Sequence, residues 1–212
     1  MPDFTLEDIQ GGLVCGLDEV GRGPLAGPVV AACVYVPENV RPLPFIKDIT
    51  DSKKLSAKKR EALYLLITEH CDWAVSEKPP AEIDEINILQ ASLVAMSDAF
   101  NALDKRFKHA LVDGNKLPQL PCSATYVIKG DGKSVSIAAA SIVAKVTRDR
   151  IMADLHAQHP QYGWNTNSGY PSKAHREAID LHGITPHHRK SFAPVRNFLL
   201  HGKTRSPIET AA

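Results

Sequence analysis

Two apolar runs near the start of the chain are separated by a loop rich in glycine and proline. Residues 13–17 and 29–36 consist largely of Val, Leu, Ala, Cys and Tyr, which are typical of buried strands. Because the connection between them is short, we predict that the two strands pair as an antiparallel hairpin. Similar short runs predict three further strands, at 72–75, 110–112 and 125–128.

Helices are predicted where apolar residues recur every three or four positions. Residues 56–70 form an amphipathic pattern that begins at Ser56, a suitable N-cap. A longer apolar stripe runs from Ile86 to Phe107, and the small residues of 137–144 can pack closely as another helix. After residue 157, helical patterns return in two short pieces, at 174–181 and 194–200.

These elements together predict an α/β protein with a mixed five-stranded sheet flanked by helices and with a helical C-terminal extension. We expect a first domain at residues 1–157 and a helical lobe at 158–203 packed on it. Residues 204–212 are short and polar, and we expect this tail to fray.

Composition narrows the class of protein. The chain has 212 residues and 43% hydrophobic content, enough for one substantial core. Its four cysteines form no CxxC pair, so neither a disulfide framework nor a zinc finger is indicated. No apolar stretch approaches the roughly 20 residues that span a bilayer, and the N-terminus lacks a signal-peptide pattern. We expect a soluble, cytoplasmic protein that does not contact a membrane.

Charge is unevenly distributed along the chain. The formal net charge is only +1, yet residues 145–205 carry ten Lys or Arg against four Asp or Glu. This asymmetry favours a surface that faces a polyanion, although a solvated basic surface is the alternative.

Four acidic residues follow the ends of predicted strands. Asp18 and Glu19 close the first strand, and Asp113 and Asp131 follow the two later ones. Because neighbouring strands lie about 4.8 Å apart, these carboxylates can gather at one edge of the sheet, where they would require cations. Oxygen ligands suit Mg²⁺ or Mn²⁺, and two such ions would serve phosphodiester hydrolysis. Asp113-Gly114 and Asp131-Gly132 are also ordinary turn dipeptides, so each of these two acids, taken alone, can be interpreted as part of a turn.

Asp18 and Glu19 present a geometric difficulty. Successive side chains of a regular strand point to opposite faces, so both reach one metal only through local distortion or through the longer glutamate side chain. The residues Gly21 to Ala26 also match the dinucleotide-binding pattern G-x-G-x-x-A. That pattern must open a helix, whereas here another β-rich run follows, so we reject a dinucleotide site.

The loop is part of a longer likeness to a known family. Its first block is Asp18-Glu19-Val20-Gly21-Arg22-Gly23-Pro24-Leu25-Ala26-Gly27-Pro28, which closely resembles the opening signature of ribonuclease HII, the type 2 ribonuclease H. Further blocks resemble the rest of the family pattern, in order: Asp51-Ser52-Lys53-Lys54-Leu55, Val112-Asp113-Gly114-Asn115, Lys129-Gly130-Asp131, residues 138–149 and His188-Arg189-Lys190-Ser191-Phe192. The resemblance covers residues 13–196.

The resemblance implies a ribonuclease H-like fold and an endonuclease that requires Mg²⁺ or Mn²⁺. Such an enzyme cuts the RNA strand of RNA–DNA hybrids and incises 5′ to single ribonucleotides in duplex DNA, leaving 3′-hydroxyl and 5′-phosphate ends. By position in the motifs, the catalytic and metal-binding carboxylates would be Asp18, Glu19, Asp113 and Asp131.

Substrate-binding residues also follow from the resemblance. The backbone of Gly21, Arg22 and Gly23 would recognise the ribose 2′-hydroxyl, and the ring of Tyr170 would pack on the sugar after the ribonucleotide. Tyr170 could instead simply cover a loop. Candidates for phosphate contacts are Lys53, Lys145, Arg148, Arg189 and Ser191. The chain has Asn167-Ser168 where the family usually carries a basic residue, which puts the strength of backbone binding in question.

Alternative functions are a nuclease of the same fold that acts on DNA alone and a non-catalytic nucleic-acid-binding module. A zinc site at His182, His187 and His188 is disfavoured because no cysteine lies nearby and no i, i+4 histidine pair with a catalytic glutamate appears. The C-terminal tail has no aromatic motif for docking on a sliding clamp. We therefore expect a monomer without an obligate protein partner.

Overall fold

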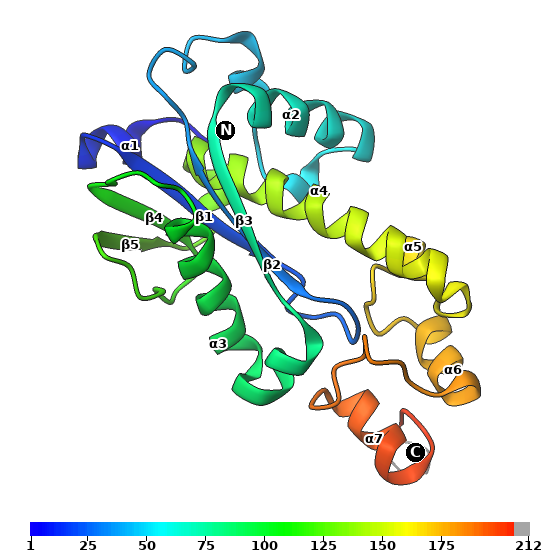
Figure 1. The fold of residues 1–212 in the computed structure, drawn as a ribbon. Coiled ribbons are helices and arrows are strands. Elements are labelled where there is room, and N and C mark those ends of the chain that lie inside the picture. Colours follow the sequence, from blue (N-terminus) through cyan, green and yellow to red (C-terminus); the bar gives the residue numbers. More distant parts are fainter. Residues whose placement is uncertain (206–212) are drawn as a thin grey trace. The chain divides into compact units, whose positions relative to one another are not determined.

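The computed structural model describes residues 1–205. Internal contacts divide the chain into two compact units (Figure 1). The first unit comprises residues 1–20, 30–77 and 92–147, and the second comprises 21–29, 78–91 and the chain from 148 onward. The division is not the linear one expected at residue 157, because the second unit takes in two short segments from the first half of the chain.

A mixed sheet of five strands forms the centre of the first unit, in the order β3-β2-β1-β4-β5. β1 pairs antiparallel with β2 and parallel with β4, and β4 pairs parallel with β5. This topology confirms the expected fold class and the opening hairpin. The strand bounds are Val14–Val20 (β1), Val29–Tyr35 (β2), Asp72–Lys78 (β3), His109–Asp113 (β4) and Ser123–Val127 (β5).

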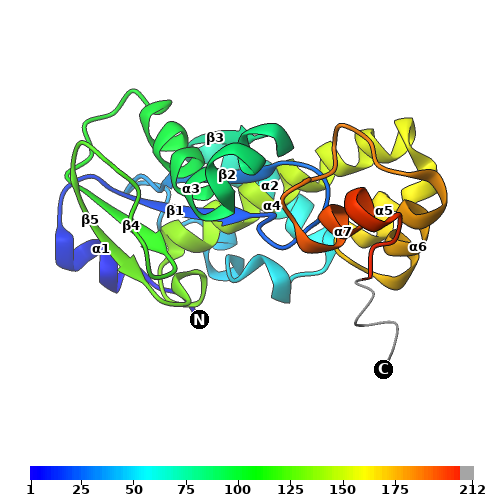
Figure 2. The same cartoon turned by 90° about the horizontal axis from the view of Figure 1, so that it is seen from below.

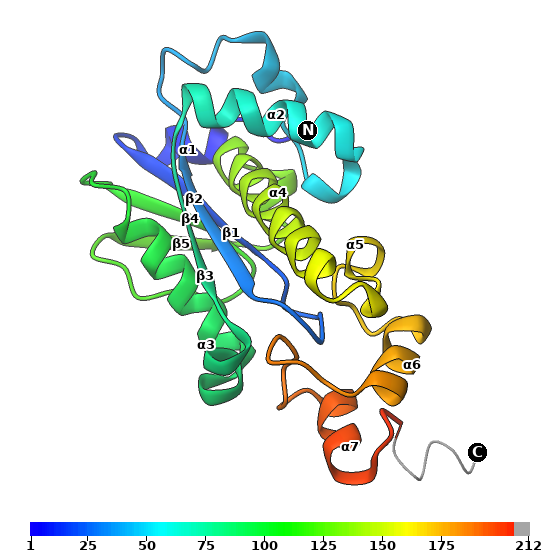
Figure 3. The same cartoon turned by 45° about the vertical axis from the view of Figure 1, so that its right-hand side comes forward.

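Alternating residues of the central strands face two different helices. Cys15 and Leu17 of β1 belong to one buried cluster with Ala95, Met96 and Phe100, which lie in α3 (Pro80–Asn101). The opposite alternation places Val14 of β1 and Leu111 of β4 in a cluster with Ile137, which lies in α4 (Val135–Gln158). The first-unit parts of α3 and α4 therefore cover opposite faces of the sheet (Figure 3).

The helices begin where the sequence supplies caps. α2 (Ala57–His70) starts as expected after Ser56, whose side chain accepts a hydrogen bond from the Lys59 amide at 3.3 Å. α3 contains an unexpected break at Asn87, which has a positive φ of 66°. The Asn87 side chain accepts hydrogen bonds from the amides of Leu89 and Gln90, so it caps the longer second part of the helix.

The C-terminal end of α3 differs from the prediction. The apolar stripe predicted a helix as far as Phe107, but α3 ends at Asn101 and residues 102–106 form a bent connection. Phe107 still packs in the core, with its ring centroid 5.4 Å from that of Phe100. Periodicity therefore identified a buried position correctly and assigned it to the wrong element.

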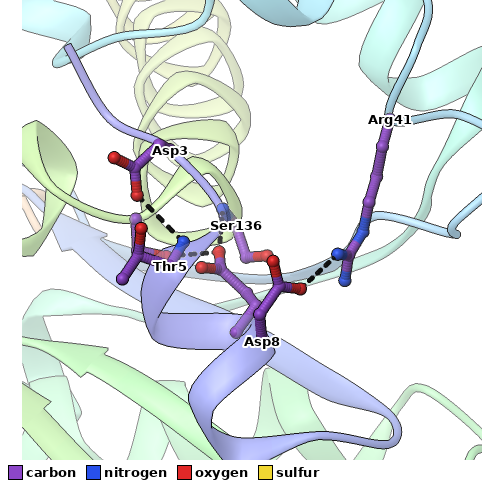
Figure 4. Close-up of polar contacts among 7 residues, drawn as sticks. Asp3, Thr5, Asp8, Arg41 and Ser136 are labelled. Carbon is purple, nitrogen blue, oxygen red and sulfur yellow. Dashed lines mark hydrogen bonds and ion pairs between the residues drawn. The ribbon is translucent and has the colours of Figure 1, made fainter.

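The short α1 (Thr5–Gln10) is attached to the start of α4 by a buried carboxylate. Glu7 is 2% exposed, and its Oε1 accepts hydrogen bonds from the Ser134 hydroxyl at 2.7 Å and the Ser136 amide at 2.9 Å. Figure 4 shows this region, including the nearby ion pair between Asp8 and Arg41 at 2.6 Å.

We expect Glu7→Ala to lower the free energy of unfolding by about 2 kcal/mol, because it leaves the buried donors of Ser134 and Ser136 without their acceptor. Urea unfolding monitored by circular dichroism measures the change. The control is Asp8→Ala, which removes an exposed ion pair of the same helix and should cost under about 1 kcal/mol. Equal losses in the two variants would contradict this assignment.

The second unit is largely helical and has its own core. Its helices include the expected C-terminal pieces, α6 (Lys173–His182) and α7 (Ala193–His201), which contact each other (Figure 2). The turn α5 (Trp164–Asn167) precedes them. The core includes Leu25, Met152, Tyr162, Trp164, Ile179 and Val195.

The chain is still ordered at the beginning of the expected tail. Thr204 is 3% exposed, and its amide donates to Asp180 at 2.7 Å, so the expectation of fraying from residue 204 is wrong at its first residue. The rest of that expectation, from 206, lies outside the described residues. Within 1–205, no helix is both long and apolar enough to cross a bilayer.

Candidate active site

Three of the four expected acids come together in the first unit. Leu17 of β1 is paired with Val112 of β4, so Asp18 and Asp113 are the next residues along two adjacent parallel strands. Asp131 lies in the turn η3 (Gly130–Gly132), which follows β5. The amide of Gly130 donates to Asp113 Oδ1 at 2.6 Å, which attaches this turn to the end of β4.

The strand alternation also sets the direction of these side chains. Asp18 lies four residues after Val14, and Asp113 lies two residues after Leu111, so both continue the α4 face of the sheet. Glu19 lies on the other face. β1 continues as a regular strand to Val20, one residue beyond the acid pair expected to close it, and Glu19 is paired with Ala31 of the α3 cluster.

The carboxylates influence one another electrostatically. Asp18 is only 6% exposed, and its pKa is raised well above the usual value by burial and then by the charges of Glu19, Asp113 and Asp131. The Glu19 amide donates to Asp18 Oδ1 at 2.7 Å and opposes this effect in part. Burial, together with neighbouring carboxylates, also raises the pKa of Asp131. The expected quartet therefore forms one electrostatically coupled group.

This coupled group is not arranged as a ready ligand cage. Among residues 1–205, no three His, Cys, Asp or Glu side chains form a set that could hold a metal ion as they stand. The same statement covers the three histidines considered for zinc. The carboxylate cluster is thus identified by the burial of Asp18, by the register of β1 and β4, and by the repulsion between the carboxylates.

Asp51 joins this group, although sequence reasoning quoted its motif without giving it a role. Its charge and a side-chain hydrogen bond both raise the pKa of Asp131. Its Oδ1 also accepts the amide of Lys53 at 2.9 Å. The available signal was the block Asp51-Ser52-Lys53, which the family resemblance had already singled out.

Lys53 is a cation associated with the cluster. Burial lowers its pKa, but attraction to Asp18, Asp131, Asp51 and Asp113 outweighs burial, so the net shift is upward. Lys53 is nevertheless exposed. Its expected phosphate contact stays a prediction. Lys145 is half-buried in the first-unit part of α4, and its expected phosphate contact stays a prediction.

In the second unit, the glycine-rich loop (residues 21–28) packs against buried side chains of later segments. Gly21 has φ of +97°, and a Cβ there would lie 2.3 Å from Nε of Arg148, so only glycine fits. Gly21 is buried, whereas Arg22 and Gly23 are exposed. Arg22 and Gly23 therefore face solvent, while Gly21 packs against the buried side chain of Arg148.

Two buried arginines bind the carbonyl groups of this loop. Arg148, 1% exposed, donates to Pro28 O, Ala26 O and Ser168 O at 2.9 to 3.1 Å. Arg189 is 0% exposed and donates to the carbonyls of Gly21, Arg22 and Gly27 at 2.6 to 3.1 Å.

This arrangement corrects the expected phosphate contacts of Arg148 and Arg189. Burial lowers the pKa of Arg148 to about 10 and that of Arg189 to about 9, which still leaves both guanidinium groups charged at neutral pH. Their donors are directed at backbone oxygens, so they support the loop. Ser191 is exposed, but its hydroxyl donates to Asp84 Oδ1 at 2.6 Å, so its expected phosphate contact would compete with this bond.

Tyr170 lies beside the exposed part of the loop. Its side chain is 48% exposed, and a Cβ on Gly23 would lie 3.2 Å from Tyr170 Cε1. The Leu25 amide donates to the Gly169 carbonyl at 2.7 Å, which joins the two segments through their backbones. Gly23 and Tyr170 therefore lie side by side in the second unit, and the substrate-binding roles expected for Gly21, Arg22, Gly23 and Tyr170 stay predictions.

Comparisons with known proteins agree with these observations. The family model described as ribonuclease HII matches residues 15–195. A ribonuclease HII from Paramagnetospirillum magneticum is 52% identical over 200 residues, covering 94% of this chain and 100% of that protein.

Solved structures give the same result. The ribonuclease H2 from Pyrococcus horikoshii OT3 matches with a TM-score of 0.76 and 28% identity, over 90% of this chain and 99% of that one. A chain from the PCNA:RNase HII complex of Archaeoglobus fulgidus matches with a TM-score of 0.70 and 27% identity, over 84% and 94% of the two chains. With its mixed sheet, its coupled strand-end acids and these matches, the chain belongs to the ribonuclease HII family.

Proposed function

We propose that the protein cleaves the RNA strand of RNA–DNA hybrids and incises duplex DNA on the 5′ side of a single embedded ribonucleotide. The products would carry 3′-hydroxyl and 5′-phosphate ends. Family membership supports the reaction class. The single observation that carries the proposed site is the register of β1 and β4, which brings Asp18 and Asp113 to adjacent positions of two parallel strands. The pKa of Asp18, raised first by burial and then by the charges of Glu19, Asp113 and Asp131, supports it.

The chemistry of this group fits divalent metal ions. Several carboxylates, one of them almost fully buried, repel one another unless a cation neutralises them, and oxygen-only donors suit Mg²⁺ or Mn²⁺. Asp18, Asp113 and Asp131 would hold the ions, with Glu19 reaching from the other face of the strand. Two bound ions would supply activation of a water and stabilisation of the leaving oxygen.

The other roles fall to exposed residues of each unit. Lys53 would contact the phosphate near the carboxylates, because its ammonium group is already attracted to them. The exposed backbone at Arg22 and Gly23 would recognise the 2′-hydroxyl, the group that distinguishes RNA from DNA. The half-exposed ring of Tyr170 would pack on the adjoining sugar. Discrimination would therefore depend on the second unit and hydrolysis on the first.

One cleavage assay tests the proposed function against its rivals. Four labelled duplexes of equal length are compared with and without Mg²⁺: all-DNA, all-RNA, RNA–DNA hybrid, and DNA with one ribonucleotide. We expect metal-dependent cutting of the last two only. Cutting of the all-DNA duplex would favour a DNA nuclease of this fold, and salt-sensitive binding without cleavage would favour a non-catalytic module.

We also propose that the protein acts as a cytoplasmic monomer without an obligate protein partner. The relative from Archaeoglobus fulgidus was solved in complex with PCNA, so a sliding clamp is the partner to test. The tail from residue 206, where the sequence shows no aromatic docking motif, lies outside the described part of the chain. Light scattering of the protein alone measures its oligomeric state, and light scattering of its mixture with a clamp measures whether the two bind.

A further inference from the structure

Two buried histidines of the second unit form a hydrogen-bonded pair that leads to the backbone of Tyr170. His175 and His188 are 0% and 1% exposed, and their Nε2 atoms lie 3.3 Å apart. His175 Nδ1 lies 2.9 Å from the Tyr170 carbonyl oxygen, and its Nε2 lies 3.0 Å from the indole nitrogen of Trp164. His188 Nδ1 lies 3.0 Å from the amide of Thr185.

The donors at the two ends determine where the protons of this pair lie. The indole N–H of Trp164 can only donate, so His175 Nε2 accepts and its proton sits on Nδ1, which donates to the Tyr170 carbonyl. The Thr185 amide also can only donate, so His188 Nδ1 accepts and its proton sits on Nε2. His188 Nε2 then donates to His175 Nε2 at 3.3 Å. His175 Nε2 therefore accepts from two donors, the closer of which is the Trp164 indole at 3.0 Å.

The same bonds keep both rings neutral. A second proton on His175 Nε2 would face the indole of Trp164, and one on His188 Nδ1 would face the amide of Thr185. Burial lowers the pKa of His175, and burial followed by the nearby His175 lowers that of His188 to about 3. Each ring therefore has one tautomer and one orientation over the physiological pH range.

One end of the pair fixes a strained turn before Tyr170. Ser168 and Gly169 both have positive φ, of 48° and 81°, which glycine adopts freely but which strains the backbone at Ser168. The Tyr170 amide donates to Asn167 O at 2.8 Å, and the Tyr170 carbonyl accepts from the Ser172 amide at 2.8 Å and from His175 Nδ1 at 2.9 Å. Both backbone polar groups of Tyr170 are thus fixed while its ring remains half exposed.

The other end of the pair reaches the glycine-rich loop. His188 forms an isolated antiparallel bridge with Ala26, and the following residue, Arg189, donates to the carbonyls of Gly21 and Arg22. The histidine pair therefore connects the segment carrying Tyr170 with the segment that supports Gly21–Gly23.

We propose that His175, paired with His188, is a positioning residue that fixes the ring of Tyr170 against the Gly21–Gly23 turn and so sets the preference for an embedded ribonucleotide over a long hybrid. The inference rests on the proposed role of Tyr170 in reading the sugar. Because His175 is completely buried, packing alone would otherwise account for its presence there. The inference gives it a role in positioning as well.

Two substitutions of His175 separate positioning from packing. In His175→Asn the amide nitrogen takes the place of Nδ1 and can still donate to Tyr170, while the contacts of Nε2 are lost. In His175→Gln the amide oxygen reaches the place of Nε2 and can accept from Trp164 and His188, while the donor to Tyr170 is lost. Both variants remove the ring, so both should lower the melting temperature by similar amounts. His201→Gln, at an exposed histidine of α7, is the control.

The measurement is kcat and KM on a duplex with one ribonucleotide and on a hybrid of equal length. We expect His175→Gln to reduce the ratio of the two kcat/KM values about fivefold to tenfold, the effect of one lost hydrogen bond, and His175→Asn to keep it within about twofold. Equal changes of the ratio in both variants, or changes that follow melting temperature alone, would overturn the inference while leaving the proposed function intact. A wild-type protein that cuts neither substrate would reject the proposed function and the inference together.

A spectroscopic measurement tests the proton arrangement separately from activity. In ¹⁵N-histidine-labelled protein at pH 7.5, we expect His175 as the neutral Nδ1–H tautomer and His188 as the neutral Nε2–H tautomer. The opposite tautomer at His175 would remove the donor to Tyr170 and overturn the inference.

Discussion

Asp113→Asn is expected to lower kcat on the order of a thousandfold on a duplex containing one ribonucleotide, with substrate binding changed little. Asparagine keeps the shape of the side chain, and its carbonyl oxygen can still accept the Gly130 amide that now bonds to Asp113 at 2.6 Å. The fold of the η3 turn should survive, while one of the charges that raise the pKa of Asp18 disappears. The fall in kcat then measures the effect of removing one negative charge from the carboxylate cluster.

Turnover is measured under saturating Mg²⁺, and binding by fluorescence anisotropy of the labelled duplex. Asp48→Asn provides the matched control, because Asp48 is an exposed acid of the same unit, paired with Lys59 at 2.9 Å. It should leave turnover unchanged. Ordinary metal-dependent activity of Asp113→Asn would remove this residue from the catalytic group and, with it, the proposed site.

Tyr170→Ala should reduce kcat/KM on the single-ribonucleotide duplex on the order of tenfold and should affect a long hybrid much less. The ring is 48% exposed and lies next to Gly23, so its removal opens little of the core and takes away a surface for the sugar. A long hybrid offers many equivalent registers, so one lost contact matters less for its cleavage.

Tyr126→Ala is a suitable control, because Tyr126 is 51% exposed on β5 of the first unit and has no expected role in binding. Steady-state kinetics on both substrates give the comparison. An equal loss on the two substrates would show that Tyr170 contributes to affinity in general and would contradict its assignment to the RNA-to-DNA junction.

The strands β1, β2 and β4 could be predicted from the sequence because they are buried β-rich runs, short and bounded by glycine, proline or acids. The run that predicted β5 was also expected to be buried, but most of that strand is exposed. The extent of α3 could not be predicted, since an apolar repeat indicates which positions are buried and does not report on the backbone between them. Phe107 continues the repeat from a bent connection, and Asn87 breaks the helix with its own side chain as the new cap. Both deviations depend on local backbone geometry.

The candidate site was predictable where topology determines it. Acids that follow adjacent strands must lie close together, which accounts for Asp18 and Asp113. The sequence also shows that Arg148 and Arg189 are cationic, but it gives no indication that a nearby loop turns several carbonyl oxygens toward them. Their burial follows from that loop and not from their own neighbours in the chain.

The two buried arginines that bind the glycine-rich loop also have a consequence for biosynthesis. Arg189 bonds to carbonyls as many as 168 positions earlier in the chain, and Arg148 to ones up to 122 positions earlier. A nascent polypeptide on the ribosome would therefore carry the proposed catalytic residues Asp18 and Glu19 long before the glycine-rich loop acquires the bonds that shape it. Recognition of the ribose would be the last property to mature, so a translation product that stops short of residue 189 should lack it.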